Sequence, residues 1–451
     1  MADSRRVGFV SLGCPKALVD SEHIVTGLTR SGYEVVEEDT AADVVVINTC
    51  GFIDHAKAES YEAIERALDE AGEVVVTGCL GADAAALKQR YPQLKFVSGP
   101  AEVQPVMDAV ATYVPPGDAR ATALPGEART RLTPAHYAYL KISEGCNHTC
   151  SFCIIPQMRG KLRSRLIGDV LREAEALVAD GAQELLVIAQ DLSAYGVDLR
   201  YAEDRFHDAQ LVTNLHTLCE QLGAIAPWVR LHYVYPYPSV DRLIPLMAEG
   251  KLLPYLDIPL QHAAPDVLKA MRRPAAAEKT LERIKHWRQI CPEIAIRSTF
   301  IVGFPGETEA HVGQLLDFLE EAELDRVGCF TYSAVEGAQA NLIADHVDEN
   351  DKLDRQEMVY ETQAQISRQR LNRHVGQTLR VLVDEVVEQQ GDTWLVGRSQ
   401  FDAPEIDGLV HARTGGQPTR PGDFAWVKIT DHDDHDLTGT VVGSAIQLKD
   451  A

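Results

Sequence analysis

Short apolar runs rich in β-branched residues alternate with helix-length segments at the start of the chain. Three such runs occupy residues 7–12, 44–47 and 74–76, and segments such as 21–31 and 56–71 separate them. This spacing is typical of buried strands joined by crossover helices. Residues 5–115 are therefore predicted to form a parallel α/β sheet domain.

The same alternation resumes after residues 115–134, a stretch rich in Pro, Gly and Arg that is predicted to be a linker. Six further strand-like runs lie at residues 137–142, 184–188, 229–235, 255–260, 295–302 and 327–332. Helical stretches such as 168–180, 211–222 and 278–290 lie between them. Six βα units predict a partial, TIM-like (β/α)6 barrel over residues 132–370. Such sheets and barrels place their chemistry at the carboxyl ends of the strands.

The end of the chain, from about residue 348, follows a different pattern. Residues 348–374 have the pattern of a long charged helix, and five short strand-like runs follow at 379–387, 394–398, 408–411, 424–429 and 437–442. This predicts a small antiparallel β-barrel over residues 372–448. Small barrels often bind RNA through basic faces, but residues 372–451 hold seven Lys and Arg against thirteen Asp and Glu. This excess of acidic over basic residues favours a basic protein as partner.

The composition of the 451-residue chain is that of an acidic globular protein. Its net charge of −24 comes from 43 Lys and Arg against 67 Asp and Glu, which opposes general binding of nucleic acid. Because no charged-then-apolar leader and no apolar run of about twenty residues is present, we expect a cytoplasmic protein that does not enter a membrane. Nine cysteines, an odd number, then indicate ligands and not a disulfide framework.

Three cysteines lie close together directly after the first strand-like run of the second domain. Cys146, Cys150 and Cys153 form a Cys-x3-Cys-x2-Cys pattern in a loop opened by Gly145, so their thiolates can converge on one centre. Iron–sulfur cubanes usually take four cysteines, and a tight group of three therefore indicates a [4Fe-4S] cluster with one open iron. The alternative is a structural zinc site with His148 as the fourth ligand.

A second set of cysteines follows the three strand-like runs of the N-terminal domain. Cys14, Cys50 and Cys79 each come within a few residues of the end of a run and beside a glycine. In an open parallel sheet these loops gather at one edge, where ligands bind. Any single cysteine is most often an ordinary packing residue, but the repeated position predicts a second three-cysteine cluster. The remaining cysteines are interpreted as packing residues: Cys219, Cys291 and Cys329.

Other strand ends of the second domain carry polar or glycine-rich residues. A glycine-rich turn after the fifth run would let backbone groups approach a nucleoside closely, and a plain strand-to-helix turn is the alternative. Arg297 alternates within that run, so it either points into the barrel to meet a carboxylate or ribose hydroxyl, or faces the surface. The candidate cofactor-binding residues are Gln190, Asp191, Arg297, Gly303, Gly306 and Glu307.

Three domains in this order resemble the radical S-adenosylmethionine (SAM) methylthiotransferases, which end in a small TRAM barrel. The likeness covers nearly the whole chain and rests on segments 11–22, 144–160, 231–238, 261–265 and 271–274, the second of which contains Cys-Asn-His-Thr-Cys-Ser-Phe-Cys-Ile-Ile-Pro. These segments resemble the branch that modifies a ribosomal protein more than the branch that modifies transfer RNA. Members commonly have Asn at the position of Ala17, a departure that touches no predicted ligand.

The resemblance implies two [4Fe-4S] clusters and SAM as cofactors. The cysteines of the second domain would hold the cluster that splits SAM to a 5′-deoxyadenosyl radical, and those of the first domain an auxiliary cluster that carries sulfur. A cofactor radical is needed because no acid–base side chain here can break an unactivated C–H bond. The implied product is 3-methylthioaspartate, formed at the β-carbon of one aspartate in the small-subunit ribosomal protein uS12. Basic residues beside the cluster that splits SAM are expected to guide this substrate or to anchor the loop: Arg159, Arg163 and Arg165.

Two other functions stay open. The same chemistry on transfer RNA is motivated by the small C-terminal barrel and predicts tight, salt-sensitive binding of transfer RNA. A non-catalytic iron–sulfur interaction or redox-sensing protein would hold both clusters and never cleave SAM. An electron donor and a sulfur source are the further partners that the favoured function implies, and it implies no membrane.

Overall fold

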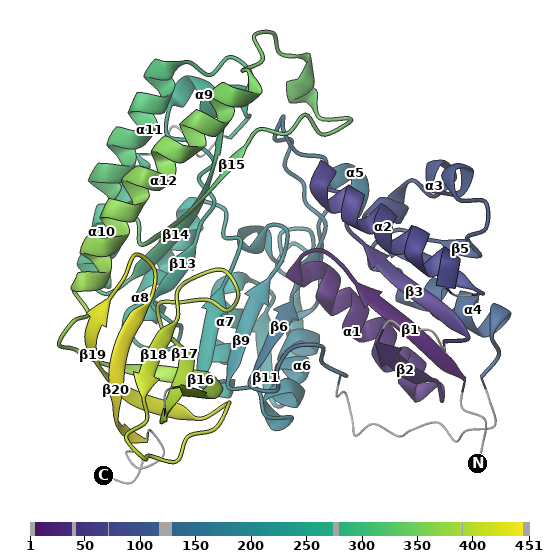
Figure 1. Ribbon diagram of the computed structural model, residues 1–451, viewed down its shortest axis with the longest axis horizontal. Coiled ribbons are helices and arrows are strands. Elements are labelled where there is room, and N and C mark those ends of the chain that lie inside the picture. Colours follow the sequence, from purple (N-terminus) through teal and green to yellow (C-terminus); the bar gives the residue numbers. More distant parts are fainter. Residues whose placement is uncertain are drawn as a thin grey trace.

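The computed structural model describes residues 5–37, 42–70, 72–116, 129–273, 279–389 and 391–444. These residues form an N-terminal sheet domain, a larger half-barrel and a small closed barrel (Figure 1). The N-terminal domain and the closed barrel lie on different sides of the half-barrel (Figure 1). Most of the predicted linker, residues 117–128, lies outside the described residues.

Five parallel strands in the order β2-β1-β3-β4-β5 form the N-terminal sheet. The residues of β3 are all buried, as expected for a strand covered by helices on both faces. Two short edge strands, β2 and β5, escaped the sequence prediction. The elements are β1 (Arg6–Ser11), α1 (Pro15–Arg30), β2 (Glu34–Glu37), β3 (Val44–Thr49), α2 (Asp54–Glu70), β4 (Val74–Gly78), α3 (Ala84–Arg90), β5 (Phe96–Val97) and α4 (Val103–Tyr113).

The half-barrel has six parallel strands in the order β6-β9-β12-β13-β14-β15, which confirms the predicted fold class. The main strands and helices are β6 (Tyr137–Lys141), α6 (Ile167–Ala179), β9 (Glu184–Ile188), α7 (Leu215–Ile225), β12 (Trp228–Leu231), α8 (Ile244–Ala248), β13 (Tyr255–Asp257), α10 (Thr280–Ile290), β14 (Ala295–Val302), α11 (Glu309–Ala322) and β15 (Arg326–Thr331). Shorter insertions are β7 (Ser143–Glu144), α5 (Ile155–Arg159), β8 (Arg163–Ser164), β10 (Glu203–Phe206), β11 (Ala209–Val212) and α9 (Pro265–Ala270).

Helix α12 (Glu349–Asn372) runs along the outside of the half-barrel and leads into the closed barrel (Figure 1). Val359 and Ile366 on α12 pack into the core of the half-barrel, so the charged helix is anchored by an apolar stripe. The closed barrel has the strand order β16-β17-β18-β20-β19. Its β18–β20 pairing is parallel, whereas we expected antiparallel pairings alone. Its strands are β16 (Thr378–Gln389), β17 (Asp392–Ser399), β18 (Val410–Arg413), β19 (Phe424–His432) and β20 (Leu437–Ser444).

A buried cluster of charged side chains joins the closed barrel to the half-barrel. Glu184 on β9 accepts a hydrogen bond from Arg230 Nε at 2.7 Å and is also paired with Arg398 on β17. Arg398 donates in turn to Asp384 on β16, with its Nε 2.9 Å from Oδ2. The side chains of Glu184 and Arg230 are 0% exposed, so these pairs lie in a region of low dielectric constant.

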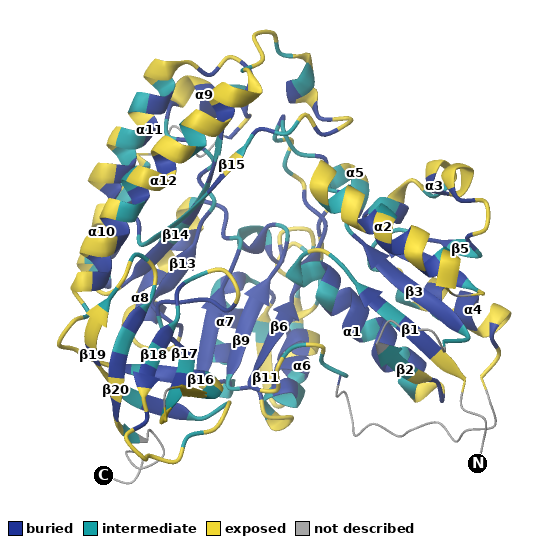
Figure 2. Cartoon of the chain, in the orientation of Figure 1, coloured by how far each residue is buried: buried dark blue, intermediate teal, exposed yellow. Residues whose placement is uncertain are grey.

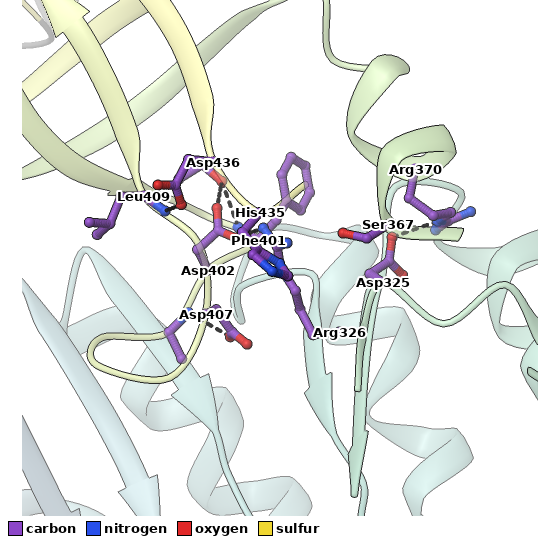
Figure 3. Close-up of polar contacts among 12 residues, drawn as sticks. Asp325, Arg326, Ser367, Arg370, Phe401, Asp402, Asp407, Leu409, His435 and Asp436 are labelled. Carbon is purple, nitrogen blue, oxygen red and sulfur yellow. Dashed lines mark hydrogen bonds and ion pairs between the residues drawn. The ribbon is translucent and has the colours of Figure 1, made fainter. Parts of the chain in front are cut away.

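A second group of ion pairs lies at the edge of the same junction (Figure 3). Arg326 Nη2 on β15 is 2.6 Å from Asp402 Oδ1 in the loop after β17. Asp325 accepts from Arg370 Nε of α12 at 2.6 Å. The Glu184 cluster and the Arg326–Asp402 pair fix the closed barrel against the half-barrel, whereas the Asp325–Arg370 pair fixes α12 against the half-barrel.

The cores of the two parallel sheets are separated from solvent by their helices. Figure 2 shows the central strands of both sheets, such as β3 and β9, as buried and the outer faces of α10, α11 and α12 as exposed. No helix in the described part of the chain is long and apolar enough to span a bilayer.

Candidate functional site

One cavity of about 550 Å3 lies between the N-terminal sheet and the half-barrel. Loops at the carboxyl ends of strands from both sheets line it, which is where ligands bind in folds of this type. Both predicted cysteine sets reach this cavity: Cys14, Cys50 and Cys79, here named the N-terminal triplet, and Cys146, Cys150 and Cys153, the core triplet. Docking of the two domains thus brings together six thiols from two separate folds.

The core triplet occupies a loop that the short β7–β8 pairing closes at its base. The backbone N–H groups of His148 and Ile155 donate to Cys146 Sγ at 3.5 Å and to Cys153 Sγ at 3.4 Å. Burial outweighs these donors and raises the pKa of Cys146 to about 12 and that of Cys153 to about 11. A metal cluster therefore has to displace protons when it binds here.

Gly145 sets the geometry at the entrance of this loop. Its φ is +79°, and a Cβ there would lie 2.2 Å from the carbonyl oxygen of Lys161. We expect Gly145→Ala to lower the bound iron of reconstituted protein by about half, because the clash is with backbone and would open the core loop while the other triplet keeps its cluster. Anaerobic reconstitution followed by an iron assay measures this.

Gly160 provides the matched control in the same loop. Its φ is +76°, but a Cβ there meets nothing within 4 Å. Gly160→Ala should therefore cost only backbone strain, about 1–3 kcal/mol for a residue at this φ with a ψ of −169°, and retain its iron. Equal iron contents in the two variants would refute the role given to Gly145.

The N-terminal triplet stands at the ends of β1, β3 and β4. Cys50 and Cys79 directly follow β3 and β4, and Cys14 precedes α1. Burial opposes ionisation of all three thiols and raises the pKa of Cys50 and of Cys79. At Cys14 the nearby cations Lys16 and Arg159 overcome burial and hold the pKa below its ordinary value. The triplet therefore lies in a positively charged environment, which favours thiolate ligands.

His148, the proposed fourth ligand in the zinc interpretation, is engaged elsewhere. Its Nε2 is 2.8 Å from Asp191 Oδ2 and 3.2 Å from the hydroxyl of Tyr237, and its ring stacks on Tyr235 at a centroid distance of 3.9 Å. These contacts leave the zinc interpretation without its fourth ligand in this arrangement.

The two triplets suit a cluster larger than a single ion. All six thiols are free of disulfide bonds. Across the described ranges, no group of three or more His, Cys, Asp or Glu side chains is close enough to hold one metal ion. A cubane is bound by thiolates at its corners, which stand farther apart than the ligands of one ion. The donor set and the shared cavity therefore fit iron–sulfur clusters.

Three cations line the cavity: Lys16, Arg159 and Arg273. Arg273 lies over the ring of Tyr235, with 4.1 Å from Cζ to the centroid, and its Nη2 donates to the carbonyl of Pro259 at 2.7 Å. Lys16 and Arg273 were not predicted as site residues. The position of Lys16, two residues after Cys14, was the available signal, whereas Arg273 follows α9 and no strand.

Arg159 connects the core cysteine loop to the N-terminal domain. Its Nη1 lies 3.0 Å from Glu144 Oε1 and 3.3 Å from Asp20 Oδ2, and Lys141 pairs with the same two acids. Burial opposes the charge of Glu144, but Lys141 and Arg159 lower its pKa to about 2. Of the two roles foreseen for Arg159, this geometry fits an anchor of the loop.

The other two predicted guiding residues lie outside the cavity lining. Arg165 Nη1 is 2.5 Å from Glu173 Oε2 and 2.9 Å from the carbonyl of Lys141, so Arg165 supports the half-barrel. Arg163 on β8 is exposed. A contact of Arg163 with substrate therefore stays a prediction.

Of the six predicted cofactor contacts, Gln190 lines the cavity. Its Nε2 also donates to Glu144 Oε1 at 2.6 Å. Asp191 holds His148, as described above. Glu307 turns back on its own loop, where it accepts from the N–H of Gly303 at 2.9 Å and from Arg355 Nη1 at 2.9 Å. The turn that contains Gly303, Gly306 and Glu307 is thus held by its own backbone and by α12, and it does not line this cavity.

Arg297 requires a correction. It lies in the amino-terminal half of β14, away from the strand end that faces the cavity. Its Nε is 3.2 Å from Asp407 Oδ1 of the closed barrel, and its Nη1 is 3.5 Å from Asp257 Oδ1. Arg297 is therefore a residue of the junction between the two barrels and is removed from the candidate cofactor contacts.

Comparison with known families agrees with the three parts of the fold. Residues 6–99 match the Uncharacterized protein family UPF0004, residues 140–319 the Radical SAM superfamily, and residues 375–442 the TRAM domain. Among solved structures, the radical S-adenosylmethionine methyltransferase TsrM from Kitasatospora setae superposes with a TM-score of 0.53 at 16% identity, over 73% of this chain and 75% of that one. That similarity supports the fold.

Curated relatives are similar over almost the full chain. The ribosomal protein uS12 methylthiotransferase RimO of Xanthomonas campestris is 57% identical over 97% of this chain and 95% of its own length. The proteins of the same name from Saccharophagus degradans and Alkalilimnicola ehrlichii are each 57% identical, over 97% and 98% of this chain and 91% and 99% of their own lengths. With this identity over three matching domains, the chain belongs to the RimO family of radical SAM methylthiotransferases.

Proposed function

We propose that the protein adds a methylthio group to the β-carbon of an aspartate in ribosomal protein uS12, which gives 3-methylthioaspartate. The observation that carries this proposal is the single cavity that both cysteine triplets line. The uS12 methylthiotransferase names of relatives at 57% identity support the same substrate for this chain.

Two [4Fe-4S] clusters and SAM are the cofactors in this proposal, with one cluster on each triplet. When bound, these groups supply the radical that removes an unactivated hydrogen atom and the sulfur and methyl group that replace it. Radical SAM membership supports iron–sulfur and SAM chemistry as such, and the presence of two triplets at one cavity supports the number of clusters.

The chain itself positions the substrate and shields the reacting carbon from water. Apolar side chains, among them Phe52, Ile53 and Phe152, line the cavity and limit the access of water to a reacting carbon. The two triplets belong to different domains, so a substrate carbon between them would face both. The buried pairs of Arg159 with Asp20 and Glu144 hold that separation constant.

The charge of the chain favours a basic protein over transfer RNA. The net charge is −24, and residues 372–451, which contain the TRAM barrel, have thirteen acidic against seven basic residues. Phosphates would be repelled by this surface, whereas a basic ribosomal protein would be attracted to it. We therefore infer that the TRAM barrel contributes to recognition of the protein substrate.

An anaerobic competition assay tests the substrate. Reconstituted protein is incubated with SAM, a strong reductant, a uS12 loop peptide and an anticodon stem-loop RNA, and both acceptors are analysed by mass spectrometry. We expect a methylthio gain on the aspartate of the peptide alone. A gain on the RNA alone would overturn the proposal in favour of the transfer RNA branch. Formation of neither product in the presence of SAM cleavage would count against uS12 as substrate.

The proposal also includes two further partners, a cellular location and a division of the chain into domains. It requires an electron donor and a source of sulfur, and it places the reaction in the cytoplasm, where ribosomal proteins are made. It divides the chain into an auxiliary-cluster domain at residues 5–115, a radical SAM core at 132–370 and a TRAM barrel at 372–448, of which residues 445–448 lie outside the described residues.

A further inference from the structure

The charge balance of the cavity is one-sided. Lys16, Arg159 and Arg273 line it, and among the described residues no Asp or Glu side chain does. Arg159 is neutralised by Asp20 and Glu144, and Arg273 is held by a carbonyl group and an aromatic ring. Neither Lys16 nor Arg273 contacts a carboxylate among the described residues, but Arg273 Nη1 also lies 3.9 Å from Cys150 Sγ, so Lys16 is the less constrained of these two cations.

Lys16 bridges the two halves of the site. It lies in the first turn of α1, two residues after Cys14, and its Nζ is 3.2 Å from the centroid of the Tyr233 ring in the loop after β12. The ammonium group therefore lies between the N-terminal triplet and the half-barrel. Because Tyr233 is itself part of the cavity lining, Lys16 faces the space in which a substrate must sit.

The helix position of Lys16 and the backbone conformation of Tyr233 are each locally unfavourable. The amino end of a helix favours negative charge, so a lysine in the first turn of α1 is electrostatically unfavourable. Tyr233 has a φ of +60°, a strained conformation for an aromatic residue, and its backbone N–H is held by Asp257 Oδ2 at 3.1 Å. Strain of this kind persists where the surrounding structure imposes it, and it is often found at functional sites.

A half-buried ammonium without a carboxylate partner is poised to bind an anion. A cation–π contact places a ring face against the ammonium group and supplies no carboxylate oxygen. A charge-assisted hydrogen bond to a carboxylate would complete the coordination of Nζ, which has three donors. The size of the site, about 550 Å3 shared with cofactors, suits a side-chain carboxylate on a loop.

We propose that Lys16 binds the carboxylate of the acceptor aspartate and so places its β-carbon between the two triplets. This inference rests on the proposed function, since it names the residue that selects aspartate as the acceptor. Lys16 is thereby a specificity-determining residue, and Tyr233 holds its ammonium group in position. The β-carbon is one bond from the carboxylate, so an anchored carboxylate leaves that carbon little freedom.

The test pairs Lys16→Met with a change in the substrate. Two uS12 loop peptides, one with the acceptor aspartate and one with asparagine in its place, are presented to protein loaded with clusters and SAM. Equilibrium binding is measured by fluorescence anisotropy, and turnover by mass spectrometry. Unsubstituted protein should bind the aspartate peptide about 100-fold more tightly than the asparagine peptide, because asparagine leaves Lys16 without its anion.

In Lys16→Met this preference should fall to within a few-fold, through loss of binding to the aspartate peptide. Lys16→Arg should restore part of the preference, since it keeps the charge with a different geometry. Lys88→Met, a change of an exposed lysine on α3, is the matched control and should leave the preference unchanged. Iron content and the cluster absorption spectrum should be the same in all four proteins.

Three outcomes would overturn the inference. Full discrimination between the peptides in Lys16→Met would mean that another group binds the carboxylate. Loss of SAM binding in Lys16→Met with unchanged peptide binding would show that Lys16 holds the carboxylate of SAM. If unsubstituted protein binds and modifies neither peptide while it cleaves SAM, the proposed function fails and the inference fails with it. The first two outcomes leave the proposed function intact.

Discussion

Cys150→Ala is expected to abolish both SAM cleavage and methylthio transfer, whereas Cys50→Ala is expected to abolish methylthio transfer alone. Each variant should bind about four irons where the unsubstituted chain binds about eight, because each removes one corner of one cubane. Cys150→Ala should lose SAM cleavage and all product. Cys50→Ala should still cleave SAM to 5′-deoxyadenosine but transfer no methylthio group.

The reason for this asymmetry lies in the separation of the two triplets. They line one cavity but stand on different domains, so loss of one cluster leaves the fold around the other intact. Chromatography of 5′-deoxyadenosine and mass spectrometry of the uS12 peptide measure the two activities. Cys219→Ala, a change of a buried cysteine on α7 outside the cavity, is the control and should keep both clusters. If Cys50→Ala retained full methylthio transfer, the N-terminal triplet would have no part in the chemistry.

Glu184→Gln is expected to be the most destabilising single change at the junction of the half-barrel and the closed barrel. It removes the negative charge between Arg230 and Arg398, both of which are almost fully buried. Loss of one partner from a buried pair leaves an uncompensated charge and typically costs ~3–5 kcal/mol. Urea unfolding under anaerobic conditions, followed by tryptophan fluorescence, measures the change. Trp228 lies at this junction and reports on it.

The pH dependence of stability provides a second measure of how much the Glu184 carboxylate stabilises the junction. Burial opposes the charge of Glu184, but Arg398 and Arg230 lower its pKa below the ordinary value of 4.5. The stabilisation is therefore complete above pH 4.5 and is lost as the pH falls through the lowered value. Glu184→Gln should lack this part of the acid dependence.

Glu321→Gln is the control, because Glu321 pairs with Lys285 on the surface, where both side chains are more than half exposed. Pairs of this kind contribute little to stability. A Glu184→Gln variant as stable as Glu321→Gln would show that the buried charges are dispensable for the junction.

The strands that sequence patterns locate best are those covered on both faces. The predicted run 184–188 coincides with β9, whose residues are all buried, because a nearly continuous apolar run with turn residues at both ends leaves little choice. The run at 229–235 was predicted too long. The chain leaves the sheet after Leu231, and Tyr233 adopts a positive φ that ends the strand.

The hairpin β10–β11 shows how a local pattern misleads. Leu211 and Val212 are apolar and were assigned to the start of a helix, but they belong to β11. Helix α7 begins only at Leu215, where the side chain of Asn214 accepts from the N–H of Thr217 at 2.9 Å. The N-cap residue was present in the sequence, and it marks the boundary better than hydrophobicity does.

The candidate site also contains residues that the sequence could locate and residues that it could not. Each cysteine triplet could be placed at one edge of its own sheet, because the positions of its cysteines after strands follow from local pattern and topology. Lys16 could not, since its contact with Tyr233 depends on how two domains dock, and Arg273 could not, since it follows α9 and no strand. Arg297 was misplaced because its partner Asp407 is 110 residues away and alternation along a strand does not reveal which barrel it faces.

The ion pairs between the N-terminal domain and the half-barrel have a consequence for synthesis of the chain. Asp20 and Glu22 are buried on α1, and their partners Lys141 and Arg129 come more than a hundred residues later. Domains form in the order in which they leave the ribosome. The nascent N-terminal domain thus presents two uncompensated acids on the face of α1 that later residues will cover, and it acquires its mature surface only when those residues emerge and supply the cations.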